Sequence, residues 1–209
     1  MTAQKLTLFH CPHTRSIAVL GLLEELGVEY ELELVNLKTG DQRKPEYLAI
    51  NPMGKVPALR HGDVVIIERP AIMMYLADLF PEKGLAPRIG DPLRGPYLQW
   101  MVFYGACFEP ALLDHSLKRE PAPRERCAYG DYESVMNAIA KQLEKGPYLL
   151  GEQFTAADVL WGGSLSYTMA FGLVPELPVF RRYADLVASR PALQRAVAKD
   201  AELLKAMGG

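Results

Sequence analysis

Apolar residues in the first eighty positions of the chain alternate between strand spacing and helix spacing. Lys5–His10 is a short apolar run, and Tyr30–Val35 alternates polar and apolar residues as a strand does. Between them, Ser16–Leu26 carries apolar residues three and four positions apart, and Gly27 follows where a helix C′ residue is expected. The later elements expected here are a short helix or turn at 44–50, strands at 58–60 and 64–67, and a helix at 70–80. This order predicts one small mixed sheet with helices on both faces.

The remainder of the chain shows helical spacing only. Pro81–Pro92 is rich in proline and other turn formers, which indicates a linker between domains. The expected organisation is an α/β domain at 1–82, a linker at 83–91 and an all-α domain at 92–209. Helices are predicted at 94–116, 124–145, 155–172, 179–189 and 191–207.

Thr155 and Asp158 form the pattern of an N-terminal capping box. The Thr155 hydroxyl can accept from the N–H of Asp158, and the Asp158 carboxylate can reach back to the N–H of Thr155. Phe154 occupies the position that staples against the next turn. We interpret this box as a folding element and not as a site.

Composition excludes several classes of protein. The 209 residues are 49% hydrophobic and 23% charged with a net charge of −2, which gives no electrostatic footprint for nucleic acid or an anionic membrane. No apolar run approaches the roughly 20 residues that span a bilayer, and the polar N-terminus has no secretory signal. The three cysteines lack disulfide-framework or metal spacing, so we expect no metal and a reducing cytoplasm.

The most informative stretch is 51–78. Pro57 has no N–H to give to a sheet, and the bond before it is one where a cis peptide costs little. Held there, Val56 would have its backbone N–H and C=O free to pair with another extended chain. His61-Gly62-Asp63 is a turn between two short strands, and Glu68 follows where a helix begins and backbone N–H groups receive anions.

This spacing resembles the glutathione transferase family, over essentially the whole chain. The family signature is a Val-Pro with a cis proline, then a Glu-Ser pair that opens a helix continuing Ala-Ile-x-x-Tyr-Leu. The resemblance implies a thioredoxin-like N-terminal domain, an all-α C-terminal domain, and the tripeptide glutathione as co-substrate. It implies that Val56, held by Pro57, pairs with the cysteinyl unit of glutathione, and that Glu68 meets the γ-glutamyl ammonium. Gln42 and Lys55 are the expected partners of the glycyl carboxylate.

Arg69 departs from that signature, because the family usually has Ser after the Glu. An arginine can bind the γ-glutamyl carboxylate bidentately, but its long stem moves the charge away from the backbone. Pro70 lies in the first helical turn, where its missing N–H does no harm. The alternative interpretation is that Arg69 is a solvated residue at the helix start.

The loop Cys11–Ser16 is expected to activate the glutathione sulfur. A hydroxyl hydrogen bond and the positive end of a helix dipole both favour the thiolate over a free thiol of pKa about 8.5. Thr14 and Ser16 are the candidates, because the run Pro-His-Thr-Arg-Ser resembles bacterial members with Ser/Thr-Arg-Ser here; either may equally be a simple N-cap. The loop has no Tyr, which argues against the tyrosine-activated class. Cys11, before Pro12, is the competing candidate, as in glutaredoxins and cysteine-type transferases.

The acceptor side is expected on the first long helix of the second domain. Tyr104 and Phe108 belong to an aromatic cluster at spacings of three or four, a pattern that is more often core than pocket. We expect Tyr104, Phe108 and His13 to line an acceptor pocket, with Tyr104 at its mouth. The leading function is thiolate attack on a small apolar electrophile, as in detoxification. The alternatives are a Cys11-dependent thiol reductase and a non-catalytic binding module, which Arg69 keeps open. The resemblance also implies a homodimer.

Overall fold

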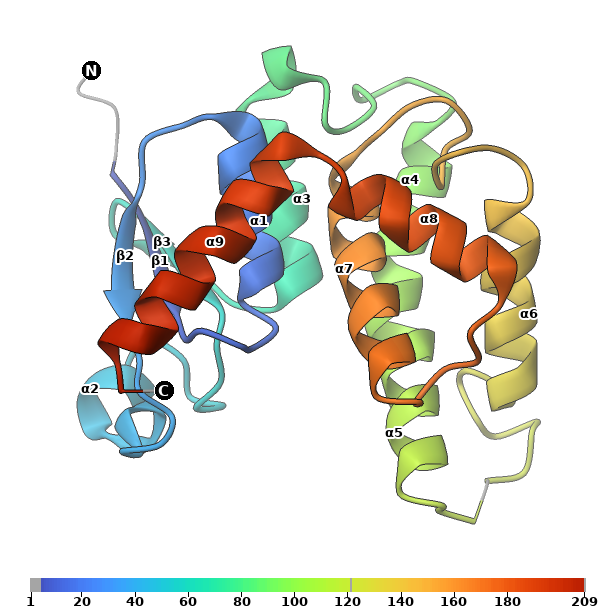
Figure 1. Ribbon diagram of the computed structural model, residues 1–209, viewed down its shortest axis with the longest axis horizontal. Helices are drawn as coiled ribbons and strands as arrows, with labels where there is room; N and C mark the ends of the chain where they lie inside the picture. Colours follow the sequence, from blue (N-terminus) through green and yellow to red (C-terminus); the bar gives the residue numbers. More distant parts are fainter. Residues whose placement is uncertain (1–4, 121, 209) are drawn as a thin grey trace. The chain divides into compact units, whose positions relative to one another are not determined.

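The computed structural model describes residues 5–120 and 122–208 (Figure 1). The chain forms two compact units: Met1–Lys83 together with Arg190–Gly209, and Gly84–Ser189. The predicted thioredoxin-like sheet domain and the helical region are both present. The division differs from the expected all-α domain at 92–209, because the last helix packs with the first unit.

The first unit is built on a four-stranded mixed sheet with the strand order β2-β1-β3-β4. The strands are β1 (Leu6–His10), β2 (Glu31–Leu34), β3 (Ala58–His61) and β4 (Val64–Ile66). β1 pairs in parallel with β2 and antiparallel with β3, so it is central and every one of its residues is buried. Because side chains alternate along a strand, Leu8 and His10 point to one face of the sheet and Phe9 to the other.

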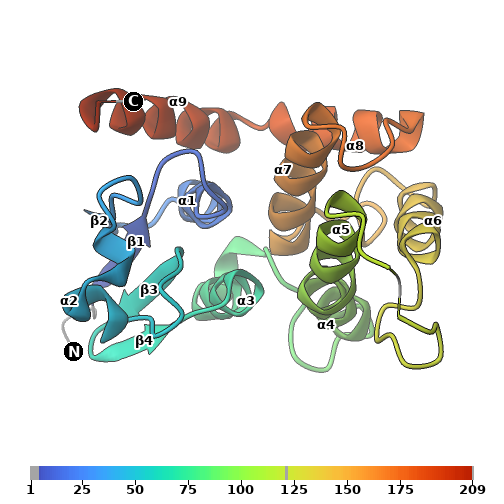
Figure 2. The same ribbon diagram turned by 90° about the horizontal axis from the view of Figure 1, so that it is seen from below.

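Helices cover both faces of this sheet, as predicted (Figure 2). Those of the first unit are α1 (Ile17–Leu26), α2 (Pro45–Leu48), α3 (Arg69–Leu79) and α9 (Pro191–Ala206), with short 3₁₀ turns at Asp41–Arg43 and Pro81–Lys83. α1 packs against α3 and α9. Tyr47 of α2 packs with Phe9, Val35 and Ala58 in a separate small core on the opposite face.

Helix α9 is attached to α1 by apolar contacts and by charge. Ala192 and Ala196 are buried, at 7% and 1% exposed, and lie four residues apart on one face of the helix. At its start, the Arg190 guanidinium donates to both carboxylate oxygens of Glu25 on α1, at 2.6 and 2.9 Å. An amphipathic pattern predicts that a helix has a buried face but not which neighbour covers that face, so the sequence did not indicate that α9 packs against α1.

The second unit is helical. Its helices are α4 (Arg94–Phe103), α5 (Glu109–Ser116), α6 (Tyr132–Leu143), α7 (Ala156–Ala170) and α8 (Pro178–Ala188), and a π-helical turn, η3 (Tyr104–Phe108), joins α4 to α5. The core centres on the fully buried Trp161 of α7, whose indole N–H donates to the carbonyl of Trp100 at 3.0 Å.

Two helices differ from their predicted extents. The helix expected at 94–116 widens at η3, because Pro110 cannot accommodate the carbonyl four residues before it in a regular α-helix. The helix expected at 124–145 begins only at Tyr132, because the Asp131 side chain caps it by accepting from the N–H of Ser134 at 2.6 Å.

The predicted capping box at the start of α7 is present. The Asp158 carboxylate accepts from the N–H of Thr155 at 2.8 Å, the N–H of Leu149 at 2.9 Å and the O–H of Tyr183 at 2.9 Å. Burial raises the pKa of Asp158, and these hydrogen bonds act in the opposite direction. The box therefore joins the start of α7 to α8 and to the preceding loop.

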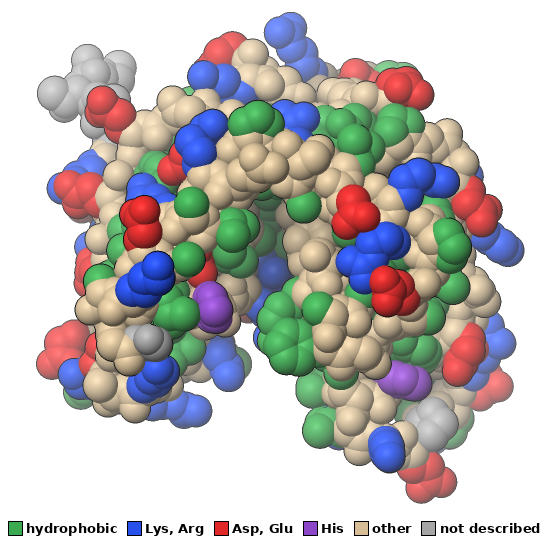
Figure 3. Space-filling view, viewed as in Figure 1, with side chains coloured by type: hydrophobic (Ala, Val, Ile, Leu, Met, Phe, Trp, Pro, Cys, Tyr) green, Lys and Arg blue, Asp and Glu red, His purple; other side chains and the backbone are tan. Residues whose placement is uncertain are grey.

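The surface is of mixed charge on the face shown in Figure 3, where basic and acidic side chains are interspersed. Within the described residues, no helix has the length and apolar character needed to cross a bilayer.

Candidate functional site

The loop between β1 and α1 is closed by a hydroxyl network centred on Ser16. Ser16 precedes α1 and is fully buried. Its Oγ lies 2.8 Å from Nδ1 of His10 and 2.8 Å from Oγ1 of Thr14, and it accepts from the N–H of Cys11 at 3.2 Å. Ser16 therefore holds the loop together, and a substrate has no path to its hydroxyl in this conformation.

Thr14 is the loop hydroxyl with solvent access. It is half-buried, and its Oγ1 lies 2.7 Å from the carbonyl of Cys11, to which it donates. Thr14 and Cys11 both line a cavity of about 350 Å³ within the first unit. Leu204 and Met207 of the last helical turn form part of its apolar lining. The volume is within the usual range for small-molecule sites, roughly 300–1,000 Å³.

His13 adopts an unusual backbone conformation in the same loop. Its φ is 56°, in the left-handed region that a side chain other than glycine enters at a cost of about 1–3 kcal/mol. The N–H of His13 donates to Oδ2 of Asp200 on α9 at 3.0 Å, and the exposed side chain lines the cavity. Sequence reasoning missed Asp200. It is buried on the same face of α9 as Ala192 and Ala196, where a carboxylate is not expected.

Two hydrogen bonds to the carbonyl of Lys55 position the main chain just before Val56. The carbonyl of Lys55 accepts from the Tyr47 hydroxyl at 2.7 Å and from the Asn51 side-chain amide at 2.8 Å. The Val56–Pro57 peptide is cis. Among residues 5–120 and 122–208, no hydrogen bond involves the N–H or C=O of Val56. The main chain of Val56 is therefore available to an extended ligand.

Gln42 lies against the same segment. Gly54 has φ 60°, and a Cβ there would lie 2.8 Å from the Gln42 carbonyl oxygen, so only glycine fits this approach. Within the described part of the chain, the buried Oε1 of Gln42 has no hydrogen-bond partner. Lys55 is solvent-exposed. Asn51, which sequence reasoning missed, is 3% exposed and positions Lys55; an Asn before Pro at a predicted turn was the available signal.

Glu68 is the second residue here with a strained backbone. It has φ 67° and ψ 113°, its carboxylate is exposed, and it immediately precedes α3. Such conformations in residues other than glycine concentrate at ligand sites. Arg69 is 8% exposed, so the alternative that it is a solvated residue is wrong.

Tyr104 and Phe108 lie in the core of the second unit. They are 2% and 0% exposed, and their ring centroids lie 5.1 and 5.0 Å from that of Trp161. The Tyr104 hydroxyl is 2.9 Å from Oγ of Ser164. Spacings of three and four place both rings on the side of the helix that faces α7, so the cluster packs as core instead of opening a pocket mouth in this unit.

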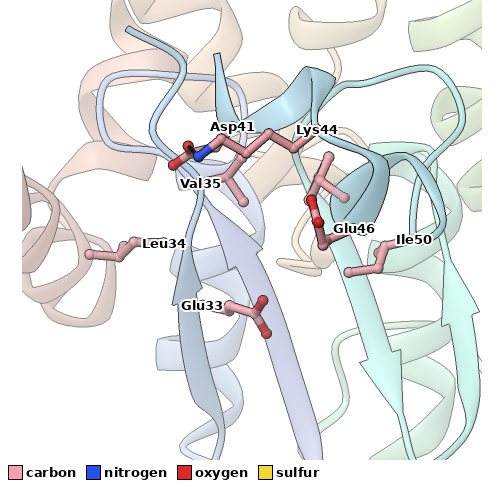
Figure 4. Close-up of a pocket in the computed structure, with 8 residues that line it drawn as sticks. Glu33, Leu34, Val35, Asp41, Lys44, Glu46 and Ile50 are labelled. Carbon is pink, nitrogen blue, oxygen red and sulfur yellow. Dashed lines mark ion pairs between the residues drawn. The ribbon is translucent and has the colours of Figure 1, made fainter. Parts of the chain in front are cut away.

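A second hollow of the first unit, about 200 Å³, lies between β2 and α2 (Figure 4). Glu33, Glu46 and Asp41 line it, and Lys44 is paired with Asp41 at 2.6 Å. None of the predicted glutathione contacts lines it. Its surplus of carboxylates is unfavourable for a ligand that carries two carboxylates. Within the described residues, no cluster of three or more His, Cys, Asp or Glu side chains is placed to hold a metal ion.

The first unit thus has the thioredoxin-like topology with a free strand edge at Val56, which is a frame for an extended peptide ligand. Residues 4–78 match the family model "Glutathione S-transferase, N-terminal domain". Glutathione S-transferase F10 from Arabidopsis thaliana is 36% identical over 154 residues, which is 68% of this chain and 70% of that protein.

Solved structures of glutathione transferases are also similar to this chain. A glutathione transferase from Methylococcus capsulatus superposes with a TM-score of 0.78 at 30% identity, covering 94% of this chain and 98% of that one. A sphingomonad glutathione S-transferase complexed with glutathione superposes with a TM-score of 0.75 at 31% identity, covering 93% of this chain and 98% of that one. The chain belongs to the glutathione S-transferase family.

Proposed function

We propose that this protein binds glutathione along Val56 and uses the Thr14 hydroxyl to activate the thiol for attack on a small apolar electrophile. The observation that carries the proposal is the contrast within one loop. Ser16 is fully buried and committed to three neighbours, whereas Thr14 reaches a cavity. On this proposal the protein is a bacterial-type member of the Ser/Thr/Cys class, and its role is in detoxification.

Glutathione binding follows from groups of the first unit. The free N–H and C=O of Val56 would pair with the cysteinyl unit as a strand does. The exposed Glu68 carboxylate would receive the γ-glutamyl ammonium, and the buried Arg69 would receive the γ-glutamyl carboxylate. Lys55 and the side-chain NH₂ of Gln42 would donate to the glycyl carboxylate. Relatives of known structure have been crystallised with glutathione.

Thiol activation needs a hydrogen-bond donor beside the sulfur. A thiolate that accepts from the Thr14 O–H at the N-terminus of α1 gains from that bond and from the helix dipole, so the pKa of the bound thiol falls. Thr14 then redirects its proton from the Cys11 carbonyl to the sulfur. The apolar lining from Leu204 and Met207 favours an apolar acceptor.

The test is the pair Thr14→Val and Thr14→Ser. Valine is isosteric but has no hydroxyl, so kcat/KM with an activated aryl halide should fall about 100-fold, and the ultraviolet thiolate absorbance of bound glutathione should shift to higher pH. Serine keeps the hydroxyl and should restore most of the activity. If the valine variant keeps wild-type activity, Thr14 is not the activating residue.

A second candidate function is supported by Cys11, which lines the same cavity although it is only 8% exposed. In a thiol reductase, the Cys11 thiolate would attack the glutathione sulfur of a mixed-disulfide substrate, breaking its S–S bond, releasing the other thiol and leaving Cys11 disulfide-bonded to glutathione. Cys11→Ser should then abolish reduction of a glutathione mixed disulfide, whereas a transferase keeps its activity in this variant. A protein that binds no glutathione would be a non-catalytic module. We expect a cytoplasmic homodimer, and a monomeric mass in solution scattering would contradict that expectation.

A further inference from the structure

A buried chain of polar groups links helix α9 to the candidate loop. The His10 ring is fully buried at the end of β1, with Nδ1 2.8 Å from Oγ of Ser16. Its Nε2 lies 3.0 Å from Oδ1 of Asp200, which is 1% exposed. This contact is at ion-pair distance but is not aligned as a hydrogen bond, and neither atom has another hydrogen-bond partner in the described residues.

Asp200 is an exception on its own helix face. Ala192, Ala196 and Asp200 lie four residues apart, so all three face the first unit's interior, yet the third is a carboxylate. Burying a carboxylate is costly unless other groups compensate for its lost hydration. The compensating groups here are His10 and the main-chain N–H of His13, and both belong to the candidate loop or directly precede it.

The carboxylate also determines where the His10 proton lies. A carboxylate accepts and does not donate, so a neutral His10 beside it carries its proton on Nε2. Nδ1 is then an acceptor and takes the Ser16 hydroxyl proton. With its proton donated to His10, Ser16 is not the donor to Thr14 or to the Cys11 carbonyl, which lies 3.0 Å from the Ser16 oxygen. Thr14 is then the donor of the Thr14–Ser16 pair, and the acceptors open to its proton are the Ser16 oxygen, the Cys11 carbonyl and a ligand in the cavity.

We propose that Asp200 is a positioning residue: by fixing the proton on His10 and the strained main chain of His13, it keeps the Thr14 hydroxyl a hydrogen-bond donor beside the cavity. The inference rests on the proposed function, and it adds a residue of the last helix to the determinants of thiol activation. Asp200 itself touches no substrate and acts only through the loop.

The first test needs no ligand. Side-chain nitrogen NMR of the full-length protein should show His10 protonated on Nε2 in the wild type. In Asp200→Asn, the amide oxygen can keep the His13 N–H while the amide NH₂ faces Nε2, so the proton should move to Nδ1. A wild-type proton on Nδ1, or the same tautomer in both proteins, would overturn the proposal.

The second test measures the consequence for glutathione. Asp200→Asn should bind glutathione with a Kd within about threefold of wild type, since Val56 and Glu68 are untouched, while kcat/KM falls about 10- to 100-fold. The thiolate absorbance of bound glutathione should shift to higher pH. Glu202→Gln, the same exchange at an exposed position of α9, is the control and should leave all values unchanged.

The outcomes separate this proposal from the proposed function. A lower melting temperature with wild-type kcat/KM and wild-type thiolate absorbance would mean that Asp200 only braces α9, and the proposal would be wrong. If the wild type binds no glutathione, the proposed function fails by itself, and the His10 tautomer in the two proteins still decides whether Asp200 sets the proton order of the loop.

Discussion

Two adjacent glycines in the middle of α7 should respond in opposite directions to the same substitution. A Cβ at Gly162 would lie 2.5 Å from Cγ1 and 2.6 Å from Cβ of Val187 on α8. Because the Val187 Cβ is itself within the overlap, rotating that side chain does not relieve it, and the two helices must separate. A Cβ at Gly163, which is exposed, would have no heavy atom of the described residues within 4 Å apart from its chain neighbours and the backbone of its own helix.

The magnitude follows from the packing and from helix propensity. Carbon atoms pack at about 3.5–4.0 Å, so the Gly162→Ala methyl group lies about 1 Å too close to Val187. Overpacking of this kind costs about 1–3 kcal/mol, and replacing glycine by alanine inside a helix returns about 0.5–1 kcal/mol. We expect Gly162→Ala to lose about 1–2 kcal/mol and Gly163→Ala to gain about 0.5–1 kcal/mol.

Urea unfolding followed by tryptophan fluorescence measures this difference directly. The chain has two tryptophans, and both Trp100 and Trp161 belong to the second unit, so the signal reports on the unit that is changed. With a slope of about 2 kcal/mol/M, the two variants should have midpoints about 1 M apart. Adding Val187→Ala to Gly162→Ala removes the overlap with the two Cγ atoms but not that with the Cβ, so it should recover only part of the loss. A Gly162→Ala variant as stable as Gly163→Ala would refute this account of the α7–α8 contact.

Three further predictions concern the buried polar contacts. Asp158→Ala leaves the N–H groups of Leu149 and Thr155 and the Tyr183 hydroxyl without their acceptor, so the free energy of unfolding should fall by about 3–5 kcal/mol. The control Asp185→Ala, at an exposed position of α8, should change the free energy of unfolding by less than about 0.5 kcal/mol. Equal losses in the two variants would contradict a stabilising role for the hydrogen bonds of Asp158. Burial, aided by the charge of Glu33, raises the pKa of Tyr47 to about 12, above about 10 in an unfolded chain. The native state therefore holds this proton more tightly, and the free energy of unfolding should fall as pH rises from about 10 to about 12; Tyr47→Phe should reduce that slope, and an unchanged slope would assign it to other groups. Arg190→Ala leaves the Glu25 side chain, only 7% exposed, without its bidentate partner, so amide hydrogen exchange should accelerate in α9 and not in α7. Wild-type protection of the α9 amides would show that the apolar contacts of α9 are enough to hold it against α1.

Much of the fold could be predicted from the sequence, because each element carries a local signal. The strand and helix spacing predicted every strand and α-helix of the sheet domain within a few residues, though not its two 3₁₀ turns, and the capping box predicted the start of α7. Two features were not predicted. The neighbour of α9 is fixed by contacts with residues far away in the chain, such as Arg190 with Glu25. The late start of α6 depends on one capping contact of Asp131.

The site was predictable only where residue type and spacing determine geometry. The Val56-Pro57 and Glu68 positions follow from a turn and a helix start, which are local. The choice between Thr14 and Ser16 depends on which side chain is buried, and that is set by how the loop before α1 folds against His10 and Cys11. Asp200 joins the loop from 187 residues away, so only its place in an alanine-lined helix face could have indicated it.

Calorimetric titration of the pure protein with reduced glutathione near pH 7 tests the central claim most directly. The account predicts binding with a micromolar to low millimolar Kd, which a Val56→Pro variant, unable to donate from its main chain, should weaken strongly. Absence of heat, together with no competition by a glutathione analogue, would contradict it, and would mean that this member of the family keeps the frame of the site without its ligand.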